Sequence, residues 1–194
     1  MLKAKSSKLM FLFIIILLLI IGVMLGQNYR TAKEQSQKRE VFINHLYFSM
    51  GDMIHTLNIL IEQNPSNEKL EEHISNLHQH LLYGDALVQS AHLFLENEFY
   101  GTSFFKYSAH FLYGINMQGV AEIPPFAENN KLDEEERAIL KTIKDSIETA
   151  QLKMHSEETG QENPNLTFKQ LSDIFYTDLV RFHDEIYRDA QKLY

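Results

Sequence analysis

Nine histidines in an acidic chain are the residues best suited to chemistry in this sequence. Imidazole binds transition metals and exchanges protons near neutral pH. His73 and His80 are seven residues apart and share one edge of a predicted helical face, but His78 points elsewhere, because i,i+2 neighbours on a helix do not face each other. Asp52 and His55 form an i,i+3 pair that helical phasing turns away from the apolar face. These positions suggest a metal-binding or hydrolytic helical-bundle enzyme.

The sequence lacks the motifs that would support such an enzyme. A ferritin-like di-iron centre needs Glu-x-x-His and a zinc protease needs His-Glu-x-x-His, and neither occurs. There is also no cysteine, no Gly-x-Ser-x-Gly, no P-loop and no glycine-rich dinucleotide turn. We therefore expect no catalytic activity, no metal site and no cofactor, and the histidine-based enzyme is the alternative hypothesis.

Aromatic residues are densest between Phe94 and Tyr113. Rigid rings, some with a polar tip, suit a ligand pocket or a docking surface for a partner protein. The competing interpretation is a short helix that buries two faces in the core. The candidate ligand or partner surface consists of Phe99, Tyr100, Phe104, Phe105, Tyr107, Phe111 and Tyr113.

A continuous apolar run, Leu9–Leu25, precedes all of these residues and would determine where in the cell they lie. Its 17 residues span about 26 Å as a helix, close to the lower limit for crossing a bilayer. A cleaved signal peptide is the alternative. The run is longer than the usual apolar core of a signal peptide, and Met24 and Gly26 make a poor cleavage site. We therefore predict an uncleaved anchor that contacts the lipid bilayer.

The charges on either side of the run set its orientation. Lys3, Lys5 and Lys8 precede it, and a similar number of basic residues follows, so counting alone gives a near tie. Moving the basic, acid-free tail across the membrane is the less favourable option, whereas long C-terminal domains cross largely regardless of charge. We expect a cytoplasmic N-terminus and a C-terminal domain outside the cytoplasm.

Gly22 and Gly26 form a Gly-x-x-x-Gly motif within the anchor. Small residues at this spacing let two membrane helices approach closely. Glycine is also common in membrane helices that do not pair. The motif is thus a candidate dimer face for a homodimer.

The composition excludes one class of partner. All 26 acidic residues follow the apolar run, and the whole chain has a net charge of −8. An acidic domain lacks the basic face that nucleic acid requires, so we expect no nucleic-acid binding. The absence of cysteine excludes disulfides.

Apolar residues at steps of three and four predict helices throughout the remaining chain. The expected helices run from Val41 to the Asn64-Pro65 break, over Glu68–Glu98, over a short aromatic Ser103–Met117, from Asp133 to Met154, and from Thr167 onward. Gly119–Asn130 is expected to be an extended crossover. Capping boxes are expected at Asp133 with Glu136 and at Thr167 with Gln170. Asp178, beside the last apolar stripe, is expected to form a hydrogen bond or salt bridge.

The predicted fold is therefore all-α: a single transmembrane helix followed by an antiparallel helical bundle with four long helices and one short one. The domain boundaries are a basic cytoplasmic tail over 1–8, an anchor over 9–26, a polar helical stalk over 27–40 and the bundle over 41–194. The predicted function is a membrane-anchored interaction module that binds a protein or a small ligand. A passive membrane tether is a further alternative.

Overall fold

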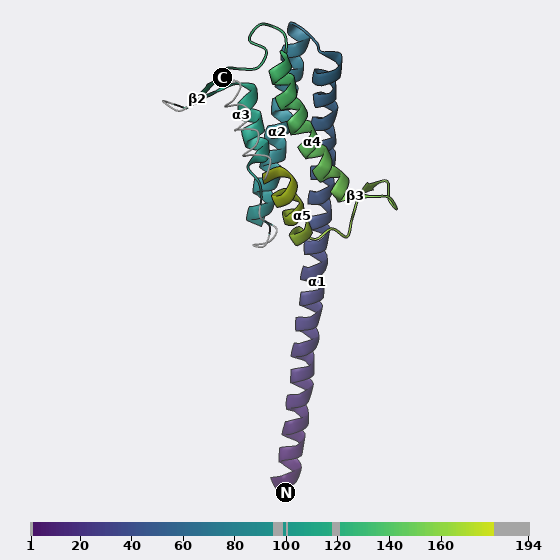
Figure 1. Ribbon diagram of the computed structural model, residues 1–194. Helices are drawn as coiled ribbons and strands as arrows, with labels where there is room; N and C mark the ends of the chain where they lie inside the picture. Colours follow the sequence, from purple (N-terminus) through teal and green to yellow (C-terminus); the bar gives the residue numbers. More distant parts are fainter. Residues whose placement is uncertain (1, 95–98, 100, 118–120, 181–194) are drawn as a thin grey trace. The chain divides into compact units, whose positions relative to one another are not determined.

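Helices make up most of the computed structural model, which describes residues 2–94, 99, 101–117 and 121–180 (Figure 1). Its order is α1 (Leu2–Asn58), η1 (Ile59–Gln63), α2 (Glu68–Phe94), α3 (Phe104–Leu112), β1 (Ile115–Met117), β2 (Ala121–Ile123), α4 (Glu134–Met154), β3 (His155–Ser156), β4 (Gln161–Glu162), α5 (Phe168–Phe175) and η2 (Tyr176–Val180). The elements η1 and η2 are single π-helical turns. The chain divides into two units, Met1–Arg39 and Glu40–Tyr194.

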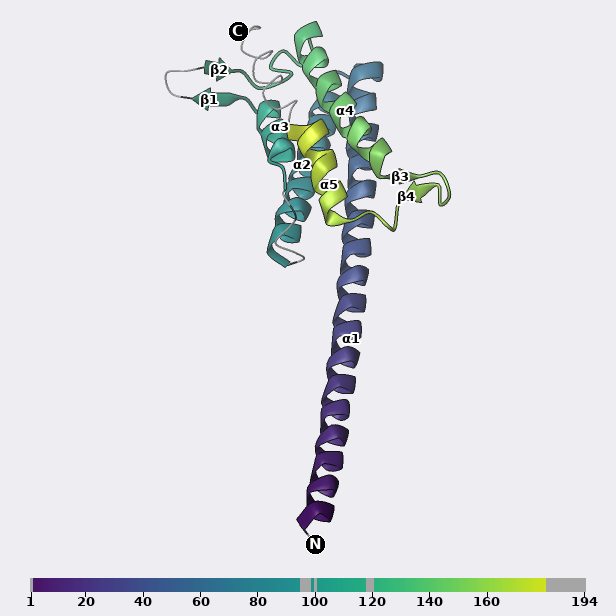
Figure 2. The same ribbon diagram turned by 60° about the horizontal axis from the view of Figure 1, so that its bottom comes forward.

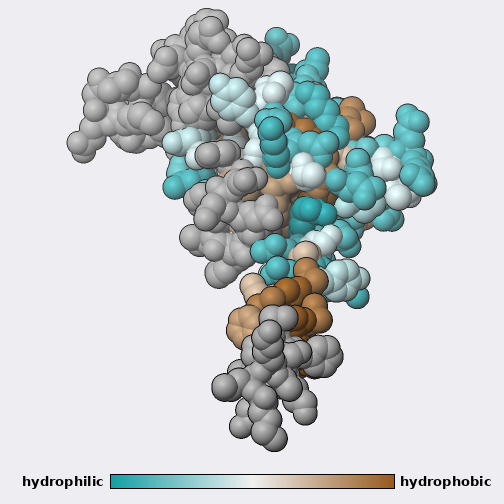
Figure 3. All heavy atoms as spheres, turned by 90° about the horizontal axis from the view of Figure 1, so that it is seen from below, coloured by the Kyte–Doolittle hydropathy of each residue, from teal (hydrophilic) through white to brown (hydrophobic). Residues whose placement is uncertain are grey.

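The first unit is a single stretch of α1 that contains the apolar run. Helical structure continues without a break from Leu2 to Asn58, as expected for a sequence with no proline and little glycine in this stretch. The described apolar side chains, from Phe13 to Leu25, are 40–64% exposed, apart from the glycine among them. Hydrophobic residues of this run are brown in Figure 3. Its length and composition are those of a membrane span or a signal sequence.

The second unit packs the remaining helices around one hydrophobic core. All five helices contribute side chains to this core, α1 through its C-terminal part. Both views show α2 and α4 beside the last part of α1, and α3 against α2 (Figures 1 and 2). The apolar stripes predicted from the sequence are buried where the structure describes their side chains, except that Leu87 on α2 and Tyr107 on α3 are half-buried. The buried residues include Leu46, Met53 and Leu57 on α1, Leu77 and Leu81 on α2, and Ile143 and Ile147 on α4.

The expected helix boundaries are confirmed at three points. Asn64 adopts a left-handed conformation and ends η1 directly before Pro65. Asp133 caps α4 in a capping box with Glu136, because each side chain accepts a hydrogen bond from the other's backbone N–H. Thr167 and Gln170 cap α5 in the same way.

The expectation of an exclusively helical chain is wrong in two places. The third helix ends at Leu112 and not at Met117, because Gly114 adopts a φ of +80° and turns the chain out of the helix. The following residues form the hairpin β1–β2, in which Ile115 pairs with Ile123. A second short hairpin, β3–β4, follows α4.

Two side-chain pairs hold the β3–β4 hairpin against α1. The Tyr47 hydroxyl lies 2.9 Å from His155 Nδ1, and the Asn44 amide donates to Glu162 Oε1 at 2.7 Å. Burial raises the pKa of Tyr47, and the nearby Glu162 carboxylate adds to this rise. The tyrosine therefore stays protonated at neutral pH, which keeps it able to donate to His155.

Gly84 lies where α2 packs against side chains of α1 and α3. A Cβ atom at this position would lie 2.5 Å from the Met53 Cε atom and 3.5 Å from the Phe105 ring. A glycine within a helix normally costs about 1 kcal/mol relative to alanine. Here it leaves room for side chains from two other helices.

Candidate functional site

The candidate aromatic surface separates into buried and exposed members. Phe99, Phe104, Phe105 and Phe111 lie in the hydrophobic core with at most 2% of their surface exposed. Phe99 packs edge-on against Phe42 and Phe175, and Phe105 also contacts Phe175 edge-on. These rings fill the space between helices, where they have no exposed face to offer a partner.

The tyrosines of the same set lie differently. Tyr113, at the C-terminal end of α3, is 53% exposed, and Tyr107 is half-buried. Tyr100 lies outside the described residues. Among the predicted surface residues, Tyr113 is therefore the one whose described side chain is most open to a ligand.

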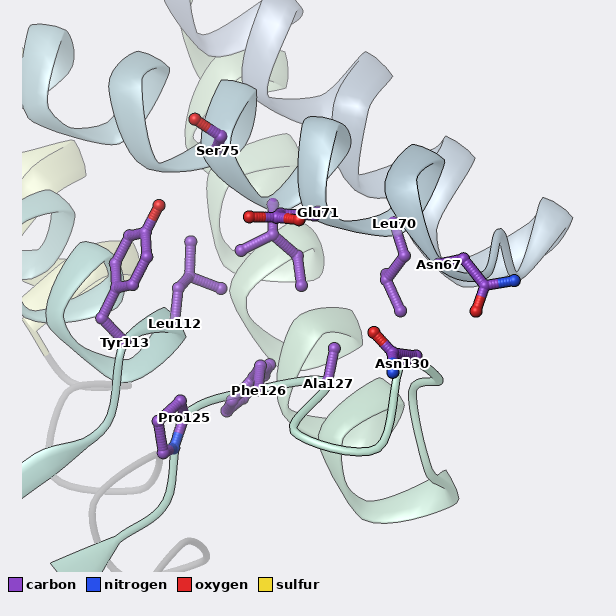
Figure 4. A pocket seen from close by; sticks show the side chains of 11 residues that line it. Asn67, Leu70, Glu71, Ser75, Leu112, Tyr113, Pro125, Phe126, Ala127 and Asn130 are labelled. Carbon is purple, nitrogen blue, oxygen red and sulfur yellow. The ribbon is translucent and has the colours of Figure 1, made fainter.

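Tyr113 lines a pocket whose residues come from separate segments of the chain and were not predicted together from the sequence. The pocket has a volume of about 280 Å³ and lies between the start of α2, the end of α3 and the segment that follows β2. Figure 4 shows the side chains of α2 and of the 125–130 segment facing each other across it. Its lining consists of Asn67, Leu70, Glu71, Ile74, Ser75, Leu112, Tyr113, Pro125, Phe126, Ala127 and Asn130.

The 125–130 segment forms one wall of this pocket, and hydrogen bonds from backbone N–H groups fix its position. The Phe126 N–H donates to the Leu112 carbonyl at 3.1 Å, and the Asn67 N–H donates to the Asn130 carbonyl at 3.2 Å. The Ala127 N–H donates to the Glu136 carboxylate at 2.8 Å. The segment is thus tied to α3, to the start of α2 and to α4, so the pocket is preformed.

Two residues of this wall have an unusual backbone conformation. Ala127 has a φ of +62° and Asn130 a φ of +59°. Asparagine tolerates this left-handed region, whereas alanine rarely adopts it. Backbone strain of this kind persists only where the surrounding contacts enforce it, and it is often found at ligand sites.

Glu136 links the pocket wall to α4. Its side chain is 6% exposed and accepts hydrogen bonds from the Ala127 and Asp133 N–H groups. Burial raises the pKa of this carboxyl, the two backbone hydrogen bonds oppose the rise, and the Asp133 charge adds to it. With both oxygens occupied by backbone donors, Glu136 is a positioning residue for the segment.

The pocket is polar and acidic at its rim and apolar at its floor. Leu70, Ile74, Leu112 and Phe126 are buried, while Glu71 is exposed. Glu71 carries the sole formal charge among the described lining side chains. Within the part of the chain that the structure describes, no lysine or arginine forms an ion pair with it.

One histidine, His78, packs against Tyr113. The ring of His78 packs edge-on against the Tyr113 ring, with 4.5 Å between centroids. Burial lowers the pKa of His78, and the charge of His110 lowers it further. His78 is therefore neutral at pH 7 and suited to packing against an aromatic ring.

The other predicted chemistry residues remain dispersed. His73 and His80 are half-buried on α2, and Asp52 and His55 are exposed on α1. Across the described residues, no group of three or more histidine, aspartate or glutamate side chains is placed to hold a metal ion.

The expectation for Asp178 is confirmed. The Lys153 ammonium lies 2.6 Å from Asp178 Oδ1 and 2.7 Å from Oδ2. Asp178 is buried, whereas the Lys153 side chain is 46% exposed. The pair joins the end of α4 to η2 and does not line the pocket.

Gly22 and Gly26 lie on the exposed apolar stretch of α1. A Cβ atom at either position would meet no other atom within 4 Å. The candidate dimer face is thus uncovered within the described chain and stays a prediction.

Comparison with known proteins gives no relative for this chain. No protein-family model matches the sequence, and neither the curated proteins nor the solved structures include a match. The function must therefore be inferred from the residues themselves.

Sequence reasoning identified Tyr113 but missed the rest of the pocket. Glu71, Ser75 and Asn130 are ordinary polar residues at helix or loop positions, and no motif connects them. The one available signal was the Pro124-Pro125-Phe126 segment, which predicted an extended crossover without indicating where it packs.

Proposed function

We propose that this protein is a single-pass membrane protein whose C-terminal part is a ligand- or partner-binding helical bundle without catalytic activity. In this proposal residues 9–26 are the anchor, residues 27–40 a helical stalk and residues 41–194 an antiparallel bundle of four long helices and one short one. The anchor contacts the bilayer, and the bundle lies outside the cytoplasm.

The observation that carries the proposal is the uncovered apolar run. Every described side chain from Phe13 to Leu25 other than glycine is large and apolar, and each is at least 40% exposed. Burying apolar surface is worth about 25 cal/mol per Å², so leaving such a run in water is strongly unfavourable. A helix that is apolar on all sides is suited to lipid.

The length of the run and its C-terminal flank support retention over cleavage. A signal peptide usually has an apolar core of 7–15 residues, followed by a small-residue cleavage site. This run is longer, and Met24 occupies a position where a small residue is needed. The basic residues on the two flanks nearly tie in number, so the proposed orientation rests on translocation. Carrying the basic, acid-free tail across the membrane is less favourable than carrying a long C-terminal domain, which favours a cytoplasmic N-terminus.

The preformed pocket at Tyr113 supports a binding role for the bundle. Its volume of about 280 Å³ lies just below the usual range for drug-sized ligands, which starts at about 300 Å³, and so suits a small compound. Its polar rim and apolar floor resemble the general composition of such sites. Gly22 and Gly26 supply a dimer face in the proposed membrane assembly.

Expression of the full chain in a bacterial host tests the anchor. We expect the protein to stay in membranes after alkaline carbonate extraction, with an intact mass that includes Met1 to Gly26. Protease added outside spheroplasts should digest the bundle and spare a cytoplasmic N-terminal tag. A mass lacking the apolar run, release by carbonate, or protection of the bundle from protease would overturn the anchor or its orientation.

A binding measurement tests the role of the bundle. The full chain in nanodiscs of zwitterionic phospholipid is screened against cationic, anionic and neutral small metabolites. A compound that binds should raise the melting temperature of the bundle. The proposal of a binding module is contradicted when no compound shifts the melting temperature and crosslinking in membranes recovers no partner.

A further inference from the structure

We propose that the pocket between α2, α3 and the 125–130 segment binds a small organic amine, with the Glu71 carboxylate as its counter-ion. This inference rests on the proposed binding function and specifies its ligand class. The pocket is the site, and the ligand combines a protonated amine with a compact apolar body.

The size of the cavity limits the ligand. A volume of about 280 Å³ corresponds to about nine water molecules in the liquid. A compound with about nine or ten non-hydrogen atoms therefore fills it. The rigid wall between Phe126 and Asn130 prevents the cavity from collapsing, because its backbone is bonded to α2, α3 and α4.

The floor selects an apolar body. Leu70, Ile74, Leu112 and Phe126 are buried and lie on three different elements around the cavity. Because only 1–6% of their surface is exposed, contact with the ligand mainly removes the ligand's own apolar surface from water. Phe126 and Tyr113 also offer aromatic rings, which favour a cation or another ring nearby.

The rim selects a cation. Glu71 is the charged group of the lining, and Ser75, Tyr113 and Asn130 add oxygen atoms that accept hydrogen bonds. These four residues are labelled around the cavity in Figure 4. An ammonium group is a donor without acceptor capacity and so complements such a rim. The acidic chain as a whole also attracts cations.

The start of α2 is the one feature that would favour an anion. The N-terminus of a helix carries a partial positive charge. In this helix the first turn already contains Glu68 and Glu71, which offset that charge. An anionic ligand would have to approach the Glu71 carboxylate, so we expect it to be rejected.

Three probes of similar size test the charge preference: 2-phenylethylamine, the neutral 2-phenylethanol and the anionic phenylacetate. They share a ring and a short chain. For the full chain in zwitterionic nanodiscs, we expect the amine to bind with a Kd of about 1 mM, given its size. The alcohol should bind about fivefold more weakly, because an exposed ion pair adds only a modest gain. The carboxylate should be weaker still.

Two variants locate the charge. Glu71→Gln keeps the shape and removes the counter-ion, so amine binding should weaken about fivefold while alcohol binding is unchanged. Glu72→Gln makes the same chemical change one position further along α2, at an exposed residue outside the lining, and should change amine binding less than twofold. Equal effects of the two substitutions would overturn the assignment of Glu71.

Methyl NMR locates the ligand without relying on a variant. With labelled isoleucine methyl groups, the amine should shift the signal of Ile74, which lines the pocket, and leave that of Ile143 in the α4 core unchanged. Equal binding of the three probes, or an unmoved Ile74 signal, contradicts the amine site. Such a failure leaves the carbonate and screening results intact, so it is distinct from failure of the proposed binding module.

Discussion

Two stretches of the same helix, α1, are both rich in large apolar residues but differ in how much of those side chains is exposed to solvent. Between Phe13 and Leu25 the apolar side chains surround the helix and are all exposed. Between Phe42 and Leu57 most of them lie on one face and are buried, although Phe48 is 48% exposed, and the polar residues His45, Asp52 and His55 are exposed. The first stretch contains no polar side chain, whereas polar residues are interspersed among the apolar ones in the second, so composition and periodicity both separate the two stretches.

This difference indicates which surroundings each stretch requires. A one-sided stripe can be covered by neighbouring helices, which leaves the polar face in water. A helix that is apolar all round cannot be covered in this way by a few neighbours and is matched by lipid. The comparison therefore predicts that polar substitutions between Phe13 and Leu25 reduce membrane retention. Polar substitutions on the buried face between Phe42 and Leu57 should instead destabilise the folded bundle.

The largest expected effect is on membrane retention. The double substitution Ile16→Asp with Ile20→Asp puts two carboxylates on one face of the exposed stretch and should disfavour insertion by about 6 kcal/mol, since each costs about 3 at the centre of a span. Carbonate extraction and flotation should show the chain leaving the membrane fraction. Ile16→Leu with Ile20→Leu is the control, and retention of the aspartate variant would refute the anchor.

The matching substitution in the buried stretch is Leu46→Asp. Leu46 is fully buried, so the substitution places an unpaired carboxylate in the core and should destabilise the bundle by at least about 4 kcal/mol. Membrane retention should persist. Proteolysis of the full chain in urea measures the loss, with Leu46→Met as a volume-conserving control. A bundle that stays resistant would show that this stripe is not a core face.

The Lys153–Asp178 pair tests how a buried charge is tolerated inside the bundle. Lys153→Met leaves the Asp178 carboxylate buried without its partner and should lower the free energy of unfolding by about 3 kcal/mol. Asp178→Asn should cost less, because the Lys153 side chain is partly exposed and can reach water. Urea unfolding, monitored by proteolysis, compares the loss of stability in the two variants. A larger loss for Asp178→Asn than for Lys153→Met would contradict the burial of Asp178.

Glycines sharpen the same contrast with smaller effects. Gly84→Val inserts methyl groups into space occupied by Met53 and should destabilise the bundle by about 1–3 kcal/mol. Gly22→Val meets no atom within 4 Å and should leave the stability of the bundle unchanged. If Gly22 lies in a dimer face, the same substitution should weaken crosslinking between two copies in the membrane. Equal melting temperatures for the two variants would argue against close packing at Gly84.

Much of the fold follows from local patterns in the sequence, whereas the pocket does not. The apolar stripes and the capping boxes at Asp133 and Thr167 depend on residues a few positions apart, so spacing alone predicts them. The end of α3 depended on the left-handed conformation of Gly114, which the helical pattern did not reveal. Whether the phenylalanines near Phe104 face inward depended on tertiary packing.

The pocket required contacts between distant segments. The 125–130 wall is held by backbone hydrogen bonds from Phe126 N–H to the Leu112 carbonyl and from Asn67 N–H to the Asn130 carbonyl. Neither pairing has a signature in the sequence. The conformation of Ala127 is similarly imposed by its surroundings and not by its own preference. The charge of Glu71 was visible in the sequence, but its position at a cavity was not.

The smallest predicted effect concerns His78, a titratable group held near the aromatic part of the bundle. Its pKa in the folded state lies below 6.5, first because of burial and then because of His110, so the unfolded chain binds more protons as the pH falls through 6.5. The contribution of His78 to stability is therefore complete above pH 6.5 and is lost towards lower pH until the folded-state pKa is passed. Urea unfolding of His78→Gln should show a weaker loss of stability between pH 7.5 and pH 5 than the parent chain, whereas His45→Gln, at an exposed position, should follow the parent. Identical pH profiles for the parent and His78→Gln would mean that His78 titrates alike in the folded and unfolded chains. In that case its contact with Tyr113 would not require a neutral ring.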